Sequence, residues 1–301
     1  MRILLLGKDG QVGWELQRAL APLGEVRALG RLDADFTQPD ALRSIVRDIA
    51  PDVIVNAAAY TAVDKAESDA NTARTVNALT PGMLAEEAAA CGAWLVHYST
   101  DYVFDGTKEG AWVEDDATNP LSVYGRTKCE GEERIRATGA RHLILRTSWV
   151  FAARGGNFAK TILRLAKERE SIEVVADQHG VPTGAELVAD ATALALYNTC
   201  RAGVSIGKLS GTYHLTANGA TTWHGYAQHV LAQALKHGAQ LKAKPETLQP
   251  IAAEAYRTSA ARPRNSRLDS QLFETTFGLQ LPDWRHHVDR LIAELAAQGQ
   301  L

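Results

Sequence analysis

The sequence predicts an α/β protein: a doubly wound parallel sheet, with a smaller C-terminal lobe interleaved with it. In the first half of the chain, short β-rich runs alternate with longer stretches rich in Ala and Leu. This is the order expected of repeated strand–helix–strand units. The apolar runs are continuous rather than alternating, as in strands that are covered on both faces. Such units join parallel strands through right-handed crossovers.

The expected elements of the first half follow this rhythm. A buried-helix interpretation of the apolar runs is weaker, because each is only about five residues long and is bounded by Gly, Asp or Asn. The strands expected here are Arg2–Leu6, Glu25–Leu29, Val53–Asn56, Trp94–Tyr98 and His142–Arg146. The helices expected between them are Gln11–Ala21, Pro39–Ala50, Asn71–Cys91 and Val123–Ala137.

The rhythm changes after Trp149, where the second lobe is expected to begin. The elements expected there are the helices Asn157–Glu168, Glu186–Thr199, Trp223–Lys236 and Trp284–Ala297 and the strands Ile172–Ala176 and Thr212–Thr216. Because Thr212–Thr216 could complete the first sheet, we expect one domain in residues 1–150 plus about 187–216. The second domain would then comprise residues 151–186 and 217–301.

Composition excludes several classes of protein. The net charge of −3 gives no electrostatic reason to expect a nucleic acid or an anionic membrane as a partner. No run reaches the roughly 18 apolar residues of a membrane span, and the apolar start ends at Gly7, too soon for a signal peptide. The three cysteines, Cys91, Cys129 and Cys200, are odd in number and lack metal-ligand spacing. We therefore expect a soluble, reduced, cytoplasmic protein.

A glycine-rich loop follows the first expected strand and opens the first helix. Gly7, Gly10 and Gly13 have the spacing GxxGxxG rather than GxGxxG. Gly7 would permit the tight turn, Gly10 would let the backbone approach a phosphate, and Gly13 would allow close contact between helix and strand. The loop could be only a tight turn, but its place at the start of an alternating βα chain predicts dinucleotide binding.

The end of the second strand bears on which dinucleotide binds. A site for NAD usually has an acid there, which bonds the ribose 2′-hydroxyl. Here the strand ends in Gly30 and Arg31, and a guanidinium suits the 2′-phosphate of NADP. In the alternative, Arg31 is only exposed, and Asp33 or Asp35 meets the adenosine. The residues favour NADPH, with NADH as the alternative cofactor.

Small and polar side chains follow the third and fourth strands. The third runs into Asn56–Thr61, whose alanines would leave room for a cofactor or simply pack under the next helix. The fourth ends in Ser99, Thr100 and Asp101. A hydroxyl there can bond a substrate oxygen, although it can also finish the strand's own hydrogen bonds. Asp101 could orient a substrate or cap the following turn.

Tyr124 and Lys128 are spaced to share one face of the helix expected over Val123–Ala137. An adjacent ammonium is expected to lower the pKa of the phenol, which could then exchange a proton with an alcohol or ketone. On its own, the pair could equally belong to an amphipathic helix with a solvated lysine. Its position after the glycine loop and the hydroxyl-bearing fourth strand favours a catalytic role.

The sequence resembles the short-chain dehydrogenase/reductase superfamily, in its extended form with a Rossmann-like sheet. The resemblance lies in the order of the glycine loop, the hydroxyl-bearing strand and the Tyr-x-x-x-Lys motif. Sequence blocks from residue 7 to about 285 resemble, more closely, the dTDP-4-dehydrorhamnose reductase family. These blocks include Gly10–Leu16, Asn56–Glu67, Ser99–Phe104, Arg146–Val150, Asn157–Lys160 and Arg262–Ser266. The resemblance implies reduction of the C4 ketone of dTDP-4-dehydro-L-rhamnose to dTDP-L-rhamnose. It implies an NADP(H)-binding first domain and a nucleotide-sugar-binding second domain.

The resemblance also implies residue roles. Tyr124 would donate the proton, Lys128 would hold the nicotinamide ribose, and Thr100 would bond the reacting oxygen. The other residues implied at the cofactor are Gly7, Gly10, Gln11, Val12, Gly13, Arg31, Asp35, Phe36, Ala59, Tyr60, Thr61 and Tyr98. Those implied at the substrate, besides Thr100, are Asp101, Trp149, Lys160, Arg262 and Arg264. Because Arg262 and Arg264 flank a proline, they would present two guanidiniums stiffly to a diphosphate, unless they are ordinary surface arginines.

Some members of the family are similar in carrying Glu15, Glu186 and Glu294 where magnesium binds between subunits. Carboxylates suit this hard cation, although three glutamates on three helices are more often solvated. The resemblance thus implies a homodimer and allows a bridging Mg²⁺. Two other functions stay open. A nucleotide-sugar epimerase or dehydratase has the same fold, but only one acid, Asp101, follows Thr100. A regulatory subunit would bind NADP without turnover.

Overall fold

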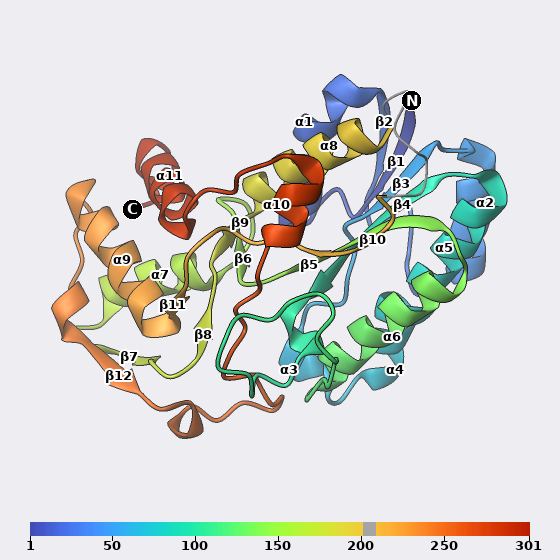
Figure 1. Cartoon of the computed structure of the whole chain (residues 1–301). Coiled ribbons are helices and arrows are strands. Elements are labelled where there is room, and N and C mark those ends of the chain that lie inside the picture. The colour runs from blue at the N-terminus through green and yellow to red at the C-terminus, as the bar shows by residue number, and fades with distance from the viewer. Residues whose placement is uncertain (201–208) are drawn as a thin grey trace.

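A computed structural model describes residues 1–200 and 209–301 of the chain. Its central sheet has six strands in the order β10-β5-β4-β3-β1-β2, and every neighbouring pair is parallel (Figure 1). The strands are β1 (Arg2–Leu6), β2 (Glu25–Leu29), β3 (Val53–Asn56), β4 (Trp94–Thr100), β5 (Arg141–Thr147) and β10 (Gly211–His214). The predicted doubly wound parallel sheet is therefore confirmed. The strand order reverses between β1 and β3, where such folds have their ligand crevice.

Helices cover both faces of the sheet because side chains of successive strand residues point to opposite faces. One face packs against α1 (Gln11–Leu20) and α8 (Ala185–Cys200). The other packs against α2 (Pro39–Ile49), α5 (Thr80–Cys91) and α6 (Val123–Ala137), at the right of Figure 1. In β1, for example, Ile3 and Leu5 face the first group, whereas Leu4 and Leu6 face the second. All four side chains are buried, which explains the continuous apolar run.

The helix predicted over Asn71–Cys91 is not a single α-helix. It consists of α4 (Ala70–Arg74), a π-helical turn η2 (Thr75–Leu79) and α5. Pro81 lacks an N–H, and its ring would collide with the Asn77 carbonyl four residues earlier in a regular α-helix. The wider turn just before the proline relieves that conflict. It also directs the Asn77 side chain toward the end of β3, where it bonds Tyr60.

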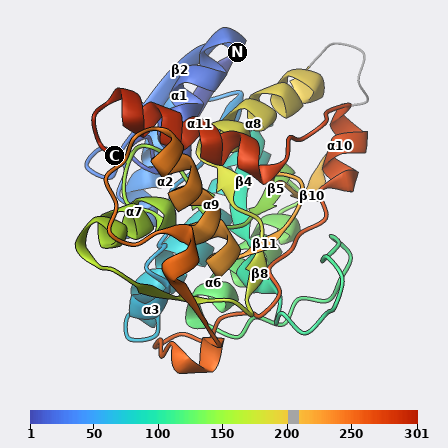
Figure 2. The ribbon, with the colours of Figure 1, turned by 90° about the vertical axis from the view of Figure 1, so that its left-hand side faces the viewer.

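The second half of the chain adds a smaller layer, which Figure 2 turns toward the viewer. The predicted helices and strand here are present as α7 (Phe158–Glu168), α9 (Trp223–Lys236), α11 (Trp284–Ala297) and β7 (Ile172–Val175). The sequence did not predict β12 (Leu248–Ile251), which pairs with β7 in a two-stranded sheet. β12 contains Pro250, which a strand at the edge of a sheet tolerates. Nor did it predict α10 (Gln271–Phe277) or the two-residue strands β6 (Val150–Phe151), β8 (His179–Gly180), β9 (Thr183–Gly184) and β11 (Thr221–Thr222).

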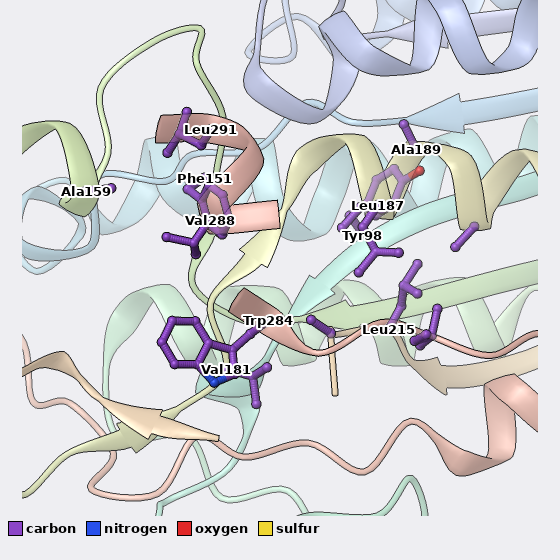
Figure 3. Packing of buried hydrophobic residues seen from close by; sticks show 14 of the residues in the cluster. Tyr98, Phe151, Ala159, Val181, Leu187, Ala189, Leu215, Trp284, Val288 and Leu291 are labelled. Atoms are coloured by element: carbon purple, nitrogen blue, oxygen red, sulfur yellow. The ribbon is translucent and has the colours of Figure 1, made fainter. Parts of the chain in front are cut away.

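One hydrophobic cluster joins the two layers. It runs from Tyr98 of β4 and Leu187 of α8 to Val288 and Leu291 of α11 (Figure 3). Trp284, at the start of α11, is almost fully buried in it. The second layer is thus packed against the first through a shared core. All three cysteines are free. In residues 1–200 and 209–301, no helix is long and apolar enough to cross a membrane.

Candidate active site

The glycine loop lies between β1 and α1 and touches the end of β3. Gly7 has φ +86°, which a residue with a Cβ rarely adopts, and a Cβ there would lie 2.7 Å from the Ala58 nitrogen. A Cβ on Gly13 would lie 2.0 Å from the Gly7 carbonyl oxygen. The roles predicted for these two glycines therefore agree with the geometry. Gly10, the residue before α1, provides no side-chain cap, so the first N–H groups of the helix are left for an anion.

The residues after β2 include an exposed arginine and two aspartates that accept hydrogen bonds from neighbouring residues. Arg31 is exposed. Asp33 accepts hydrogen bonds from the Gly30 N–H and the Lys8 ammonium, both at 3.0 Å, and these bonds lower its pKa. Hydrogen bonds from Thr37 lower the pKa of Asp35, with a smaller contribution from the charge of Arg31. Phe36 is buried in the core beneath this turn.

The segment that follows β3 carries mostly small side chains. Ala57, Ala58 and Ala59 are half-buried, and Thr61 is exposed. The Tyr60 N–H donates to the Asn77 side chain at 2.9 Å. The Asn77 side chain thus fixes the backbone of this segment. The three alanines place no bulky side chain there.

Tyr124 lies beside Thr100 because α6 packs against the turn that follows β4. That turn is η3 (Asp101–Val103), and a Cβ on Gly125 would lie 2.3 Å from the Tyr102 carbonyl oxygen. The glycine therefore lets the helix approach the turn closely. Thr100 hydrogen-bonds the Tyr124 phenol, and the Tyr102 and Tyr124 rings meet edge to face with centroids 5.6 Å apart.

The pKa of Tyr124 is raised to about 12, so the lowering expected from the sequence was wrong for the chain without ligands. Burial is the main cause, and the Asp101 charge adds to it, while the Thr100 hydrogen bond opposes both. The phenol is consequently fully protonated near neutral pH. That state is the one required of a proton donor.

Lys128 is almost fully buried, with 1% of its surface exposed. Its ammonium nitrogen lies 2.5 Å from the Tyr98 carbonyl oxygen and 3.2 Å from Nε2 of His97. Burial lowers the Lys128 pKa to about 8. The Tyr98 side chain lies in the core, where its hydroxyl bonds Thr192, so only its backbone reaches the site. Sequence reasoning missed His97; the signal was a histidine inside an otherwise apolar strand.

Asp101 is an acid whose charge acts on the Tyr124 phenol. It is 3% exposed, and burial raises its pKa to about 6 against the hydrogen bonds of Ser266 and Thr100. The Thr100 hydroxyl donates to Oδ1 at 3.1 Å. Since Ser266 belongs to the C-terminal part of the chain, Asp101 ties the strand-four turn to the second layer.

A cavity of about 1150 Å³ lies in the second layer and is bordered by Arg262 and Arg264. Phe158 and Trp223 also line it, and Trp149 stacks on Trp223 with ring centroids 3.5 Å apart. Trp149 has φ +47°, an uncommon conformation for a residue with a side chain.

The two arginines are each held by a carboxylate. Arg262 donates to Asp64 at 2.8 Å, and Arg264 pairs with Glu254. Lys160, predicted to join them, instead donates to the Ala153 carbonyl oxygen at 2.7 Å. The structure therefore brings Arg262 and Arg264 to one cavity and gives Lys160 a partner in a neighbouring loop.

Comparison with known proteins agrees with this geometry. The family model described as RmlD substrate binding domain matches residues 1–297. The chain belongs to this family. A dTDP-4-dehydrorhamnose reductase of Shigella flexneri is 52% identical over 299 residues, which cover 98% of each chain.

Two solved structures of dTDP-4-dehydrorhamnose reductases are similar to this family member over nearly its whole length. That of Clostridium acetobutylicum has a TM-score of 0.89 at 33% identity and covers 98% of this chain and 99% of its own. That of Bacillus anthracis, in complex with NADP, has a TM-score of 0.86 at 32% identity and covers 97% and 99%. The fold is thus shared with these reductases over nearly the whole length of the chain.

The three glutamates that the family resemblance linked to magnesium lie around one cavity of about 520 Å³. Burial and the charges of Glu186 and Glu294 raise the pKa of Glu15. Arg18 lies 3.5 Å from Glu15, and Arg290 lies 2.8 Å from Glu186. Among residues 1–200 and 209–301, no three His, Cys, Asp or Glu side chains form a group that could hold a metal ion. Within one chain the donor set does not fit Mg²⁺, and arginines neutralise two of the carboxylates.

Proposed function

We propose that the chain reduces the C4 ketone of dTDP-4-dehydro-L-rhamnose to dTDP-L-rhamnose with a nicotinamide cofactor. The observations that support this proposal are the hydrogen bond between Thr100 and Tyr124 and the contact of Lys128 with the Tyr98 backbone, both at the end of β4. The glycine loop follows β1 of the same sheet. The membership in the family and the reductases that match the full chain support the substrate.

Oxidation of NADPH in the presence of the keto sugar, with identification of the product, tests this function. We expect one NADPH consumed for each dTDP-L-rhamnose formed. An epimerase would recycle its cofactor, and a regulatory subunit would bind NADPH without consuming it. Either result would replace the proposed reaction.

The chemistry divides between the cofactor and the chain. When bound, the reduced nicotinamide supplies the hydride for C4. The alkoxide oxygen that develops there takes the proton of the Tyr124 phenol, and Thr100 bonds the same oxygen. Since burial keeps the Tyr124 pKa near 12, the proton stays on the phenol until a stronger base forms beside it. A proton from solvent then restores the phenol after product leaves.

Replacing Tyr124 by phenylalanine tests the donor role. Tyr124→Phe keeps the ring that packs edge to face on Tyr102 and removes only the hydroxyl. We expect kcat to fall by roughly two to four orders of magnitude, the usual contribution of general acid catalysis, with NADPH affinity unchanged. Retention of near-wild-type kcat would refute the donor role.

The second domain is proposed to bind the nucleotide sugar, in residues 151–186 and 217–301. Arg262 and Arg264 would hold the diphosphate in the 1150 Å³ cavity, while Asp101 and Trp149 would meet the sugar. Lys160 would contribute to the substrate site indirectly, by its hydrogen bond to the Ala153 carbonyl oxygen in a neighbouring loop. Arg262→Ala and Arg264→Ala should raise KM for the sugar, and unchanged KM in both would contradict the clamp.

The first domain, residues 1–150 plus about 187–216, is proposed to bind the cofactor; residues 201–208 of that range lie outside the described residues. The exposed Arg31 and the engagement of Asp33 by Lys8 favour NADPH over NADH. The backbone of the glycine loop, Gln11, Val12 and the segment Ala59–Thr61 would surround it, with Asp35 and Phe36 at the adenosine. A kcat/KM that is higher with NADH than with NADPH would reverse this preference.

A homodimer and a cytoplasmic location stay predictions, whereas the bridging Mg²⁺ that the family resemblance allowed is not supported by the described residues of one chain. Because Arg18 and Arg290 already neutralise carboxylates of the glutamate cavity, we expect EDTA to change neither the activity nor the mass of the protein in solution. A loss of dimer mass in EDTA that Mg²⁺ restores would establish the bridging metal.

A further inference from the structure

The end of β2 carries a glycine where a dinucleotide site usually has an acid. That acid follows the glycine loop by about 20 residues and bonds the ribose 2′-hydroxyl of NAD. In this chain the position falls on Gly30, the residue directly after β2. The φ of Gly30 lies outside the left-handed region, so its backbone conformation does not require a glycine.

The space that a side chain of residue 30 would enter is filled by Asp9, which belongs to the glycine loop. A Cβ on Gly30 would lie 2.1 Å from Oδ2 of Asp9 and 3.2 Å from Cε of Lys8. Oδ2 therefore lies about as far from that point as a carboxylate oxygen lies from the Cβ of its own aspartate. The carboxylate of Asp9 thus stands where the carboxylate of an acid at residue 30 would be.

Hydrogen bonds fasten the backbone around Asp9 to the end of β2. The Leu29 carbonyl oxygen accepts the N–H groups of Gly7 at 2.9 Å and of Lys8 at 3.2 Å. On its other side, the Asp9 carbonyl oxygen accepts Nε of Arg154 at 3.3 Å. The position of the Asp9 carboxylate over the strand end is therefore set by the backbone of the loop.

The Asp9 carboxylate differs from those of the neighbouring acids because it has no partner. Asp33 and Asp35 each accept two hydrogen bonds from nearby residues. In the part of the chain that the structure describes, no group donates a hydrogen bond to the Asp9 carboxylate or forms an ion pair with it. Asp9 is also exposed, so both of its oxygens are available to a ligand.

We propose that Asp9 replaces the acid of the strand end and accepts the hydroxyl groups of the adenosine ribose. Asp9 and Arg31 then act in opposite senses at the 2′ position. A 2′-hydroxyl donates to the carboxylate, whereas a 2′-phosphate is repelled by the carboxylate and attracted by the guanidinium. Asp9 thus strengthens the binding of NADH and limits the preference for NADPH that Arg31 favours.

The inference deepens the proposed function and rests on the glycine loop as the cofactor site. Asp9 also lies just before the N-terminus of α1, so its charge acts on the pyrophosphate of either cofactor. Such an effect changes the affinities for NADH and NADPH alike. The ratio of the two affinities therefore isolates the effect at the 2′ position.

Calorimetric titration of the cofactor-free protein with NADH and with NADPH tests the inference without turnover. Asp9→Asn keeps the size of the side chain and removes its charge. We expect the Kd for NADH to rise about fivefold and the Kd for NADPH to fall about fivefold, which shifts their ratio about 25-fold toward NADPH. A ratio that stays within about threefold of the wild-type value, or that shifts toward NADH, would overturn the inference.

A second set of variants tests where the carboxylate acts. Asp9→Ala removes the carboxylate and should also weaken NADH relative to NADPH. Asp9→Ala combined with Gly30→Asp returns a carboxylate to the strand end, in the space that Asp9 filled, and should restore the wild-type ratio. A double variant that keeps the ratio of Asp9→Ala would refute the placement at the ribose.

Asp48→Asn is the charge-matched control. Asp48 is an exposed acid of α2, so its neutralisation changes the net charge of the chain by the same amount. We expect this variant to keep the wild-type ratio. A shift as large as that of Asp9→Asn would mean that net charge, and not the place of Asp9, sets the ratio, and would overturn the inference.

The outcomes also separate this inference from the proposed reaction. Binding of both dinucleotides with a ratio that Asp9→Asn does not change would refute the role of Asp9, whatever the turnover. Failure of the wild-type protein to oxidise NADPH with the keto sugar would refute the proposed reaction and leave the affinity ratios standing. Binding of neither dinucleotide would refute both.

Discussion

Asp64 connects the first half of the chain, which is proposed to bind the cofactor, to the arginine proposed to hold the diphosphate. It lies in α3 (Val63–Ala66), which the segment 57–62 joins to the end of β3. Its Oδ1 accepts the Ala260 N–H at 3.1 Å, and its Oδ2 accepts Nη2 of Arg262 at 2.8 Å. The Nε atom of Arg262 is buried without a hydrogen-bond partner. Asp64 therefore fixes the guanidinium of Arg262 at the border of the cavity.

The substitution Asp64→Asn keeps the shape and the bond to Ala260 but turns an NH₂ toward the guanidinium. A charge-assisted hydrogen bond is worth about 1.5–3 kcal/mol when buried, but exposed ion pairs give about 0–1 kcal/mol. The Arg262 and Asp64 side chains are 29% and 44% exposed, so we expect a loss of about 1 kcal/mol. If all of it appears in binding, KM for the keto sugar rises about fivefold.

Steady-state oxidation of NADPH with varied keto sugar measures this effect, and a separate titration measures NADPH affinity. We expect kcat and NADPH affinity to stay within about twofold, as for loss of ground-state binding alone. Glu254→Gln is the matched control, because Glu254 and Arg264 are 64% and 65% exposed and their pair should contribute little. A KM that falls in Asp64→Asn would mean that Asp64 competes with the diphosphate for Arg262, and would refute the positioning argument.

Three further predictions concern the residues around the site. Gly13→Ala forces a Cβ to within 2.0 Å of the Gly7 carbonyl oxygen. Overpacking costs about 1–3 kcal/mol, so NADPH affinity measured by fluorescence titration should fall by about 5- to 150-fold. Glu132→Gln breaks a fully buried ion pair with Arg146, and denaturant unfolding should show a loss of about 3–5 kcal/mol. Because the Lys128 pKa is about 8 when folded and about 10.4 when unfolded, the unfolded state binds more protons between these values. The unfolding free energy should therefore rise with pH in that window by about 3 kcal/mol relative to Lys128→Met, and a flat difference would contradict the lowered pKa.

The sequence was sufficient for the sheet because its strands are buried on both faces. Each of the five apolar runs predicted as strands in the first half is a strand of the central sheet, with its ends moved by no more than two residues. Local sequence was less informative where the chain departs from regular hydrogen bonding. Pro81 can be identified in the sequence, but the π-helical turn before it also depends on the hydrogen bonds between the Asn77 side chain and the Tyr60 backbone. Those partners are remote in sequence.

Some features of the candidate site could likewise be predicted from the sequence and others could not. Tyr124, Lys128 and Thr100 could be chosen because their spacing and order correspond to a known chemistry. The pKa of Tyr124 could not be obtained from spacing, since it depends on burial and on Asp101, which only the fold brings close. His97 was overlooked for a similar reason. A histidine inside an apolar strand has a function only once its two ring nitrogens have identified partners.

The position of the phenol and the lysine depends, finally, on backbone packing along α6. A Cβ on Gly125 would lie 2.3 Å from the Tyr102 carbonyl oxygen, and a Cβ on Gly131 would lie 2.2 Å from the Asn77 carbonyl oxygen. Both glycines therefore let α6 rest directly on the backbone, one on the turn after β4 and the other on the π-helical turn. Since Lys128 lies between these two contacts, any residue larger than glycine at either one would displace α6 from β4. The helix that carries Tyr124 and Lys128 is thus fixed through backbone contacts at these two glycines.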